Sequence, residues 1–155
     1  MPENWQDDMA LISKPIDFIG INFYTSVLLR ANENPFPSYE VVRRDLPQTD
    51  MGWEIDPNAL GEVIKMVASY CGDIPIYITE NGMASKSGAE DEDRISYYES
   101  HLDVVSGACK EFPVKGYFTW SLLDNFEWAF GYDKRFGLVH VNYETQERTP
   151  KNSYV

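Results

Sequence analysis

The stretch that decides the fold is Ile76-Tyr77-Ile78-Thr79-Glu80-Asn81-Gly82, an apolar and β-branched run that stops at a carboxylate and a turn dipeptide. Isoleucine occupies every second position from 74 to 78, which predicts a largely buried strand of about six residues. Ligands bind at the carboxyl ends of strands in parallel α/β sheets and barrels, so Glu80 is well placed for chemistry. The structural alternatives are a Glu that caps the next turn and an Asn-Gly hairpin. No second alternating strand follows Gly82, which disfavours the hairpin.

The composition narrows the function. A chain of 155 residues, 43% of them hydrophobic, is long enough to bury the core of one domain. Its 4 Trp, 10 Tyr and 8 Phe are many for this length, and several lie among polar residues where no core needs them. Aromatic rings beside carboxylates suit sugars, whose C–H faces pack on π systems while their hydroxyls need fixed acceptors. The net charge of −12 repels phosphate, so we expect neither nucleic acid nor a membrane surface as a partner.

Two cysteines, Cys71 and Cys109, lie on apolar helical stripes without a CxxC motif or a nearby His pair. We therefore predict buried free thiols in preference to a disulfide. No run approaches the roughly 18 apolar residues of a membrane span, and no signal sequence is found, so we expect a cytoplasmic protein. Paired His residues or clustered carboxylates at ligand spacing are also missing, so we expect no metal and no cofactor.

Three segments are predicted before the first long helix. The apolar residues at 9–12 are expected to be buried at the end of a helix that Pro15 terminates. Residues 17–24 read as a buried strand, and polar Asn22 and Tyr24 emerge at its end. Residues 31–47 contain three prolines and no periodicity, which predicts a long and mobile surface loop.

Helices and strands alternate in the remainder of the chain. Asp56 and Pro57 are typical of a helix start, and Gly72 is typical of a helix end. Apolar residues step by three and four over 95–112, which predicts a second helix in which His101 is structural. We also predict a loop over residues 85–93, a buried strand over 114–121 and a short alternating strand over 136–143, which is followed by a turn at residues 144–147. The order strand, helix, strand, helix, strand predicts a parallel sheet with right-handed crossovers.

These motifs resemble those of the family 1 glycoside hydrolases, which are retaining β-glucosidases and 6-phospho-β-glucosidases built on a (β/α)8 barrel. Ile78-Thr79-Glu80-Asn81-Gly82 is similar to the family's nucleophile strand, and Asn22-Phe23-Tyr24 to its Asn-Tyr-Tyr motif. The other matching stretches are residues 51–55, 120–128 and 135–138. The resemblance covers nearly the whole chain and implies a partial barrel, namely its last three βα units with parallel strands. Residues 1–155 are then the C-terminal part of the catalytic barrel.

The resemblance also implies roles for single residues. Glu80 would be the nucleophile, and Tyr24 would orient it. The substrate-binding residues implied in this way are Asn22, Trp53, Trp120, Glu127, Trp128 and Phe136. Elementary chemistry agrees with this assignment, because a phenol donor keeps a rim carboxylate aimed and a Glu between aromatic rings can accept two sugar hydroxyls. A hydrophobic lid is the structural alternative for the Trp-rich stretch.

The chain departs from the family pattern in one important respect. Retaining hydrolysis needs a second carboxyl group about 5 to 5.5 Å from the nucleophile. The family carries this acid/base in an Asn-Glu-Pro motif, and no Asn-Glu-Pro occurs in these 155 residues. A Glu127 with a raised pKa is one replacement, but the family pattern places Glu127 under the far side of the sugar. Phospho-specific relatives carry a Ser and a Lys-x-Tyr just after the position of Trp128. No such Ser occurs in this chain, which favours unphosphorylated glycosides as substrates.

Two hypotheses from different classes remain open on the sequence. The first is the C-terminal part of a retaining β-glycosidase that acts on a β-glycoside or disaccharide and is inactive as an isolated chain. The second is a carbohydrate-binding or assembly module that retains only the sugar subsite. In either case a partial barrel leaves two strand edges without neighbours and leaves Phe18, Ile19, Ile21, Tyr117 and Phe118 without packing partners. We therefore expect self-association or pairing with an N-terminal half-barrel.

Overall fold

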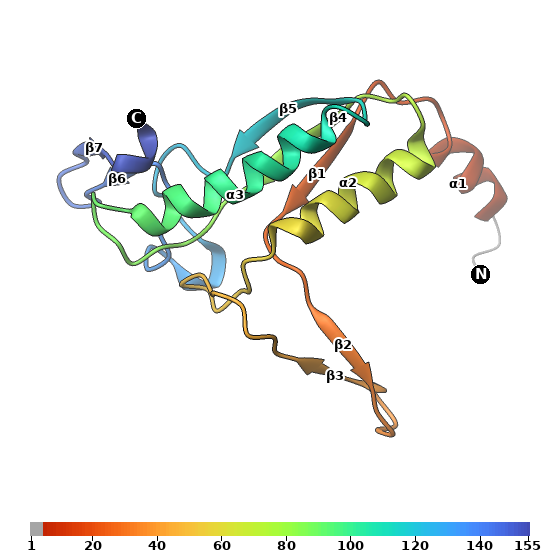
Figure 1. Ribbon diagram of the computed structural model, residues 1–155, viewed down its shortest axis with the longest axis horizontal. Coiled ribbons are helices and arrows are strands. Elements are labelled where there is room, and N and C mark those ends of the chain that lie inside the picture. Colours follow the sequence, from red (N-terminus) through yellow and green to blue (C-terminus); the bar gives the residue numbers. More distant parts are fainter. Residues whose placement is uncertain (1–4) are drawn as a thin grey trace.

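The computed structural model of the protein describes residues 5–155, so the part of the N-terminal prediction that covers residues 1–4 lies outside it. The main elements are α1 (Trp5–Ile12), β1 (Ile19–Phe23), the pair β2 (Leu28–Ala31) and β3 (Tyr39–Val42), α2 (Pro57–Cys71), β4 (Ile76–Asn81), α3 (Glu92–Ala108), β5 (Val114–Thr119), β6 (Val139–Val141) and β7 (Arg148–Pro150). Short 3₁₀ turns η1 (Trp128–Phe130) and η2 (Asn152–Tyr154) complete the chain. The strands β1, β4 and β5 form one parallel sheet in the order β1-β4-β5 (Figure 1). The predicted βαβαβ order is therefore confirmed.

One face of this sheet is covered by α2 and α3, which run side by side across it (Figure 1). Ile76 and Ile78 of β4 are fully buried there. The other buried members of this core are Ile21, Phe23, Leu60, Ile64, Ala68, Val105 and Val114. Burial of the alternate residues of β4 gives that strand a single inward face, so its register against the helices is fixed and Glu80 always reaches the same end of the sheet.

The helix α2 begins and ends where its sequence predicts. The Asp56 carboxylate accepts a hydrogen bond from the Ala59 backbone N–H at 3.3 Å, and Pro57 occupies the first turn. Gly72 follows the helix with φ +61°, a backbone conformation that residues with a Cβ rarely adopt. These two signals set the length of the helix, which feeds directly into β4.

The opposite face of the sheet is open in this chain. Phe18 and Phe118 are 55% and 57% exposed, and the ring centroid of Phe18 lies 5.5 Å from that of Tyr77 in an edge-on contact. The prediction that Ile19, Ile21 and Tyr117 share this face is wrong, because Ile21 packs in the core beneath α2 and α3, and Ile19 and Tyr117 are partly buried against that core. Alternation along β1 explains the difference, since Gly20 and Asn22 are the residues that point away from the helices.

The prediction of a structureless loop over residues 31–47 is wrong. Residues 28–31 and 39–42 pair as the antiparallel hairpin β2–β3, which projects away from the sheet and its helices (Figure 1). The β-branched and aromatic residues at 39–42 favour a strand, and the prolines that dominate the sequence pattern lie in the connection and after it. The cross-strand pair Arg30 and Glu40, 3.3 Å apart, adds a weak exposed ion pair.

Burial at two other places also differs from expectation. The helix α1 exists, but Met9, Leu11 and Ile12 are more than half exposed, because no other element of the described part of the chain covers them. Both cysteines are free as predicted, yet Cys71 is half-buried and Cys109 exposed, because each lies at the C-terminal end of its helix and beyond the core. Within residues 5–155 no helix is long and apolar enough to cross a membrane.

Candidate active site

A cavity of about 420 Å³ lies at the carboxyl ends of β1, β4 and β5. Its lining comprises Asn22, Tyr24, Trp53, Glu80, Trp120, Asn125, Phe126, Glu127, Trp128 and Phe136. All eight residues that the sequence singles out are among them. Parallel strands bring their carboxyl ends to one edge of a sheet, and this geometry gathers residues that are more than one hundred positions apart in the chain.

The floor of the cavity carries the carboxylate. The Tyr24 hydroxyl donates a hydrogen bond to Glu80 Oε2 at 2.6 Å, and the Thr79 hydroxyl donates to Asn22 Oδ1 at 2.6 Å. Burial, together with the hydrogen bond to Glu80, raises the pKa of Tyr24 far above its ordinary value. Tyr24 therefore remains protonated and acts as a donor that fixes the orientation of the carboxylate.

The residues just after Glu80 hold the strand end in place. The fully buried Asn81 donates through Nδ2 to the Phe23 carbonyl at 2.7 Å and to the Tyr97 hydroxyl at 2.9 Å. Its Oδ1 accepts from the Tyr117 hydroxyl at 2.5 Å, so one amide ties β4 to β1, α3 and β5. A Cβ at Gly82 would lie 1.9 Å from the Trp120 carbonyl oxygen, so only glycine fits. The Asn-Gly pair thus serves close packing and not a hairpin turn.

An aromatic cluster forms one wall of the cavity. The ring centroid of Tyr24 lies 5.6 Å from that of Trp53 and 6.0 Å from that of Phe136, and the centroids of Trp53 and Phe136 are 6.3 Å apart. Trp53 is delivered by a tight turn in which Gly52 has φ +71°. Edge-on and tilted contacts of this kind rigidify a wall, and the flat faces that remain suit the C–H surfaces of a sugar ring.

A second wall is the loop of residues 125–136, which we call the 125–136 loop and which ends at Phe136 of the aromatic cluster. Burial, together with the negative charge of Glu80, raises the pKa of the Glu127 carboxyl. Trp128 is 82% exposed and has φ +44°, in the left-handed region that a bulky residue rarely adopts. An exposed tryptophan held in a strained backbone conformation is typical of ligand contacts.

Two lining residues, Asn125 and Phe126, were not assigned a role by sequence reasoning. They lie inside the stretch 120–128 that carries the family resemblance, so that stretch was the available signal. The Asn125 amide donates to the Ser121 hydroxyl at 2.9 Å and to the Leu123 carbonyl at 3.1 Å, which ties it to the end of β5. Within the described residues 5–155, no three His, Cys, Asp or Glu side chains are grouped so as to hold a metal ion.

This arrangement offers a defined chemistry. A carboxylate that is aimed by a phenol can attack an electrophilic carbon, and a second carboxylate between aromatic rings can accept hydrogen bonds from hydroxyl groups. Glu80 and Glu127 are the two carboxylates among the residues that line the cavity. A polyhydroxylated ring fits both groups better than a flat apolar ligand does.

Known proteins share both the sequence and the fold. The family model described as "Glycosyl hydrolase family 1" matches residues 1–155. Beta-glucosidase A of Thermotoga maritima is 46% identical over 160 residues, which cover 99% of this chain and 36% of that enzyme. A 6-phospho-beta-galactosidase of Streptococcus equi subsp. zooepidemicus is 40% identical, over 88% of this chain and 35% of its own length.

A solved structure of the Thermotoga maritima beta-glucosidase in complex with deoxynojirimycin superposes with a TM-score of 0.92 at 44% identity, again covering 99% of this chain and 36% of that one. The chain therefore spans little more than a third of the length of the relatives that it matches. The parallel sheet β1-β4-β5, with α2 and α3, corresponds to part of their α/β barrel. The family model, the relatives and the fold together show that the chain belongs to glycosyl hydrolase family 1.

Proposed function

We propose that these 155 residues are the C-terminal part of a retaining β-glycosidase, in which Glu80 is the nucleophile and Tyr24 orients it. Asn22, Trp53, Trp120, Glu127, Trp128 and Phe136 form the sugar subsite. The observation that carries the proposal is the 2.6 Å hydrogen bond from Tyr24 to Glu80 Oε2 inside a cavity lined by all of these residues. Within residues 5–155 the hydrogen bond goes to Oε2, and Oε1 accepts no hydrogen bond that would prevent it from facing a substrate.

The reaction follows from this geometry in two steps. Glu80 forms a bond to the anomeric carbon as the glycosidic C–O bond breaks, and the departing oxygen takes a proton from an acid/base carboxyl group. Water then attacks the same carbon, gives its proton to that group and releases Glu80. We place the acid/base outside this chain, on the remaining part of the barrel, because Glu127 lies between Phe126 and Trp128 on the 125–136 loop and is better suited to hold hydroxyl groups.

Unphosphorylated glycosides are the substrates that we propose. Lys134 is the lysine on the 125–136 loop, and its ammonium group donates to the Asp50 carboxylate at 2.8 Å and to the Asp50 carbonyl at 2.7 Å. A lysine held in this way is engaged by protein groups, and residues 129–136 contain no Ser that would assist it. A phosphorylated sugar would also bring negative charge close to Glu80 and Glu127.

We also propose a cytoplasmic location, which the two free thiols Cys71 and Cys109 support, because disulfides rather than free thiols are typical of oxidising compartments. The partner that we propose is an N-terminal half-barrel that pairs with the edge strands β1 and β5 and so encloses the open face of the sheet.

A chimera tests the function. It joins the part of Thermotoga maritima beta-glucosidase A that this chain does not cover to the full 155-residue chain, at 46% identity across the replaced segment. We expect the chimera to hydrolyse an aryl β-glucoside with retention of configuration, and we expect the isolated chain to show no turnover, because proton donation alone contributes about 10² to 10⁴ in rate. The matched control is the chimera with Glu80→Gln.

A folded chimera that hydrolyses no β-glycoside would contradict the proposal. The alternative of a carbohydrate-binding module is not favoured, since binding alone requires no phenol-oriented carboxylate. It would be supported only if the isolated chain bound deoxynojirimycin, the ligand of the Thermotoga maritima relative, while the folded chimera remained inactive.

A further inference from the structure

The two ends of the 125–136 loop meet at Asp124. The Asp124 backbone N–H donates to the Val139 carbonyl at 3.0 Å, and the Gly137 N–H donates to Asp124 Oδ1 at 2.9 Å. A Cβ at Gly137 would lie 2.1 Å from the Asp124 nitrogen, so the two ends touch through backbone alone. The loop that carries Glu127 and Trp128 is thus closed at its base around one carboxylate.

The Asp124 side chain is fully buried and accepts from four donors. These are the backbone N–H groups of Gly137 and Val141, the Arg135 guanidinium at 2.8 Å and the Lys151 ammonium at 3.0 Å. Burial by itself would raise the pKa of Asp124, but the hydrogen bonds from Lys151 and Arg135 outweigh it and hold that pKa below its usual range. Asp124 is therefore a carboxylate across the neutral pH range.

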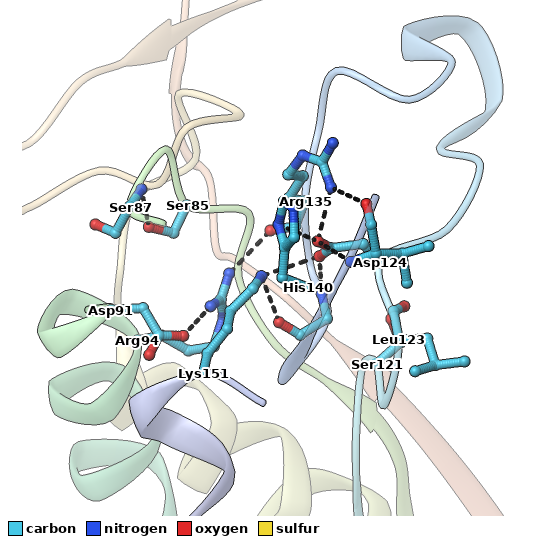
Figure 2. Close-up of polar contacts among 12 residues, drawn as sticks. Ser85, Ser87, Asp91, Arg94, Ser121, Leu123, Asp124, Arg135, His140 and Lys151 are labelled. Carbon is cyan, nitrogen blue, oxygen red and sulfur yellow. Dashed lines mark hydrogen bonds and ion pairs between the residues drawn. The ribbon is translucent and has the colours of Figure 1, made fainter. Parts of the chain in front are cut away.

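Lys151 comes from a distant part of the chain. Its side chain is fully buried, and its ammonium group also donates to the Gly137 carbonyl at 2.7 Å, so one cation binds both ends of the loop (Figure 2). Residues 148–150 immediately before it pair with β6 as the strand β7. Lys151 thus enters the base of the loop from a paired strand and not from a free tail.

The same C-terminal segment is fixed on its other side. Ser153 donates to Asp91 through its backbone N–H at 2.9 Å and through its hydroxyl at 2.7 Å. The buried Arg94 pairs with Asp91 and donates to the Arg135 carbonyl at 2.9 Å (Figure 2). Residues 151–153 therefore bridge the start of α3 to the base of the 125–136 loop.

Stability alone does not account for a lysine at this position. Burial and the nearby Arg94 lower the pKa of Lys151, while Asp124 opposes them, so the charged form is held against a desolvation penalty. Buried ion pairs of this kind are often no more stabilising than apolar residues of the same size, whereas some of them fix a single geometry. The geometry that the Lys151 ion pair can fix is that of the 125–136 loop.

We propose that Lys151 is a positioning residue for the sugar subsite, which holds the 125–136 loop, and with it Glu127 and Trp128, in the arrangement that binds the glycone. The sugar-binding part of this inference rests on the proposed function, but the loop-ordering part does not. Within residues 5–155, none of the hydrogen-bond partners of Lys151 lines the cavity, so Lys151 acts through Asp124 and Gly137.

The first test measures backbone hydrogen exchange on the full 155-residue chain with Lys151→Met, which keeps the length of the side chain and removes its charge. A hydrogen bond to a charged group is worth about 1.5 to 3 kcal/mol, so exchange across residues 125–136 should become about tenfold faster or more. Exchange in β4 should be unchanged. Ser153→Ala is the matched control, because it removes a buried contact from the same segment on the side that faces α3.

The second test measures KM and kcat of the chimera for an aryl β-glucoside. Lys151→Met should raise KM about tenfold or more, with a smaller change in kcat, because loss of aligned hydroxyl acceptors weakens sugar binding. Ser153→Ala should leave both constants near those of the unmutated chimera. An unmutated chimera without turnover would count against the proposed function, while the exchange experiment would still decide the role of Lys151.

The inference would be overturned if Lys151→Met left loop exchange unchanged, if exchange rose equally in β4, or if Ser153→Ala had the same effect. Should Lys151→Met fail to fold, the double variant Asp124→Asn/Lys151→Met decides, because it leaves no buried lone charge. Faster exchange confined to residues 125–136 would then support the inference, and loss of protection throughout the sheet would refute it.

Discussion

The floor of the cavity and the wall that the 125–136 loop forms are built in different ways. The floor carries Glu80 and Tyr24 on or just after parallel strands whose buried faces pack against α2 and α3. The wall is the 125–136 loop, in which the only regular structure is the short turn η1. The floor is held by backbone hydrogen bonds and apolar burial, whereas the wall is held by the charged side chains of Asp124, Arg135 and Lys151.

This difference matches the roles that we propose for the two regions. A nucleophile needs a position fixed within a fraction of an ångström, and strands packed on a core provide it. A subsite that accepts hydroxyl groups tolerates adjustment, and a loop anchored at its base can supply that. Substitutions in the floor should therefore change the rate of the chemical step most, and substitutions in the wall should mainly change affinity.

The largest effect is expected from substituting each of the two carboxylates, Glu80 and Glu127, in turn. In the chimera, Glu80→Gln should reduce kcat about 10⁴-fold or more, because the covalent intermediate requires this oxygen. Glu127→Ala should mainly raise KM, since its carboxylate accepts hydroxyls remote from the reacting carbon. Steady-state kinetics on an aryl β-glucoside measures both constants, and the assignment is reversed if Glu127→Ala abolishes turnover while Glu80→Gln spares it.

A smaller effect is expected within the floor. Tyr24→Phe removes the 2.6 Å hydrogen bond to Glu80 but keeps the ring between Trp53 and Phe136. We expect kcat of the chimera to fall about 10- to 100-fold, because the carboxylate is no longer aimed, and the free energy of unfolding to fall by at most about 1.5 to 3 kcal/mol, which is what a hydrogen bond to a charged group contributes. Equal kcat for Tyr24→Phe and the parent would show that Glu80 is held by packing alone.

The wall should show a characteristic pH dependence. Because burial and Glu80 raise the pKa of Glu127, its carboxyl binds a proton at a higher pH in the folded than in the unfolded protein, and ionising it disfavours the folded state. Glu127→Gln should thus slightly raise the melting temperature at neutral pH, and this gain should vanish at a pH where Glu127 is protonated in both states. A gain that persists unchanged under acid conditions would contradict the assigned cause.

The open face of the sheet gives the smallest effect. Both β1 and β5 are edge strands of the parallel sheet in this chain. Phe18, just before β1, and Phe118, on β5, are more than half exposed. We expect the isolated chain to self-associate at micromolar concentration, since screening limits the repulsion of exposed charges to about 8 Å at physiological salt. Sedimentation should show less association for Phe18→Ser/Phe118→Ser. A sharp monomer of the unmutated chain would show that other groups cover these edges.

The sequence predicted the floor well because its signals are local. Alternating isoleucines fix the buried face of β4, and the Asp56, Pro57 and Gly72 signals fix α2 to the residue. The eight site residues lie in one cavity because parallel strands end at one edge. Their gathering was predicted from the family resemblance, whereas their roles in catalysis and binding stay predictions.

The supports of the wall were not predicted because they depend on distant side chains. The residues around Lys151 in the sequence do not indicate that it is a buried partner of Asp124, because a lysine near polar residues is normally a surface charge. The same holds for Asn81, whose amide joins three elements through contacts that appear only after folding. The β2–β3 hairpin was missed for another reason, because prolines in its connection conceal a short strand that packs on no core.

The most direct test of the central claim is the mass of the covalent intermediate in the chimera. After reaction with a slow glucoside that bears a good leaving group, digestion and mass spectrometry should show one added glycosyl group, on the peptide that contains Glu80. The Glu80→Gln chimera should show none. A glycosyl group on a peptide that contains Glu127, or hydrolysis with inversion and no covalent adduct, would contradict the account.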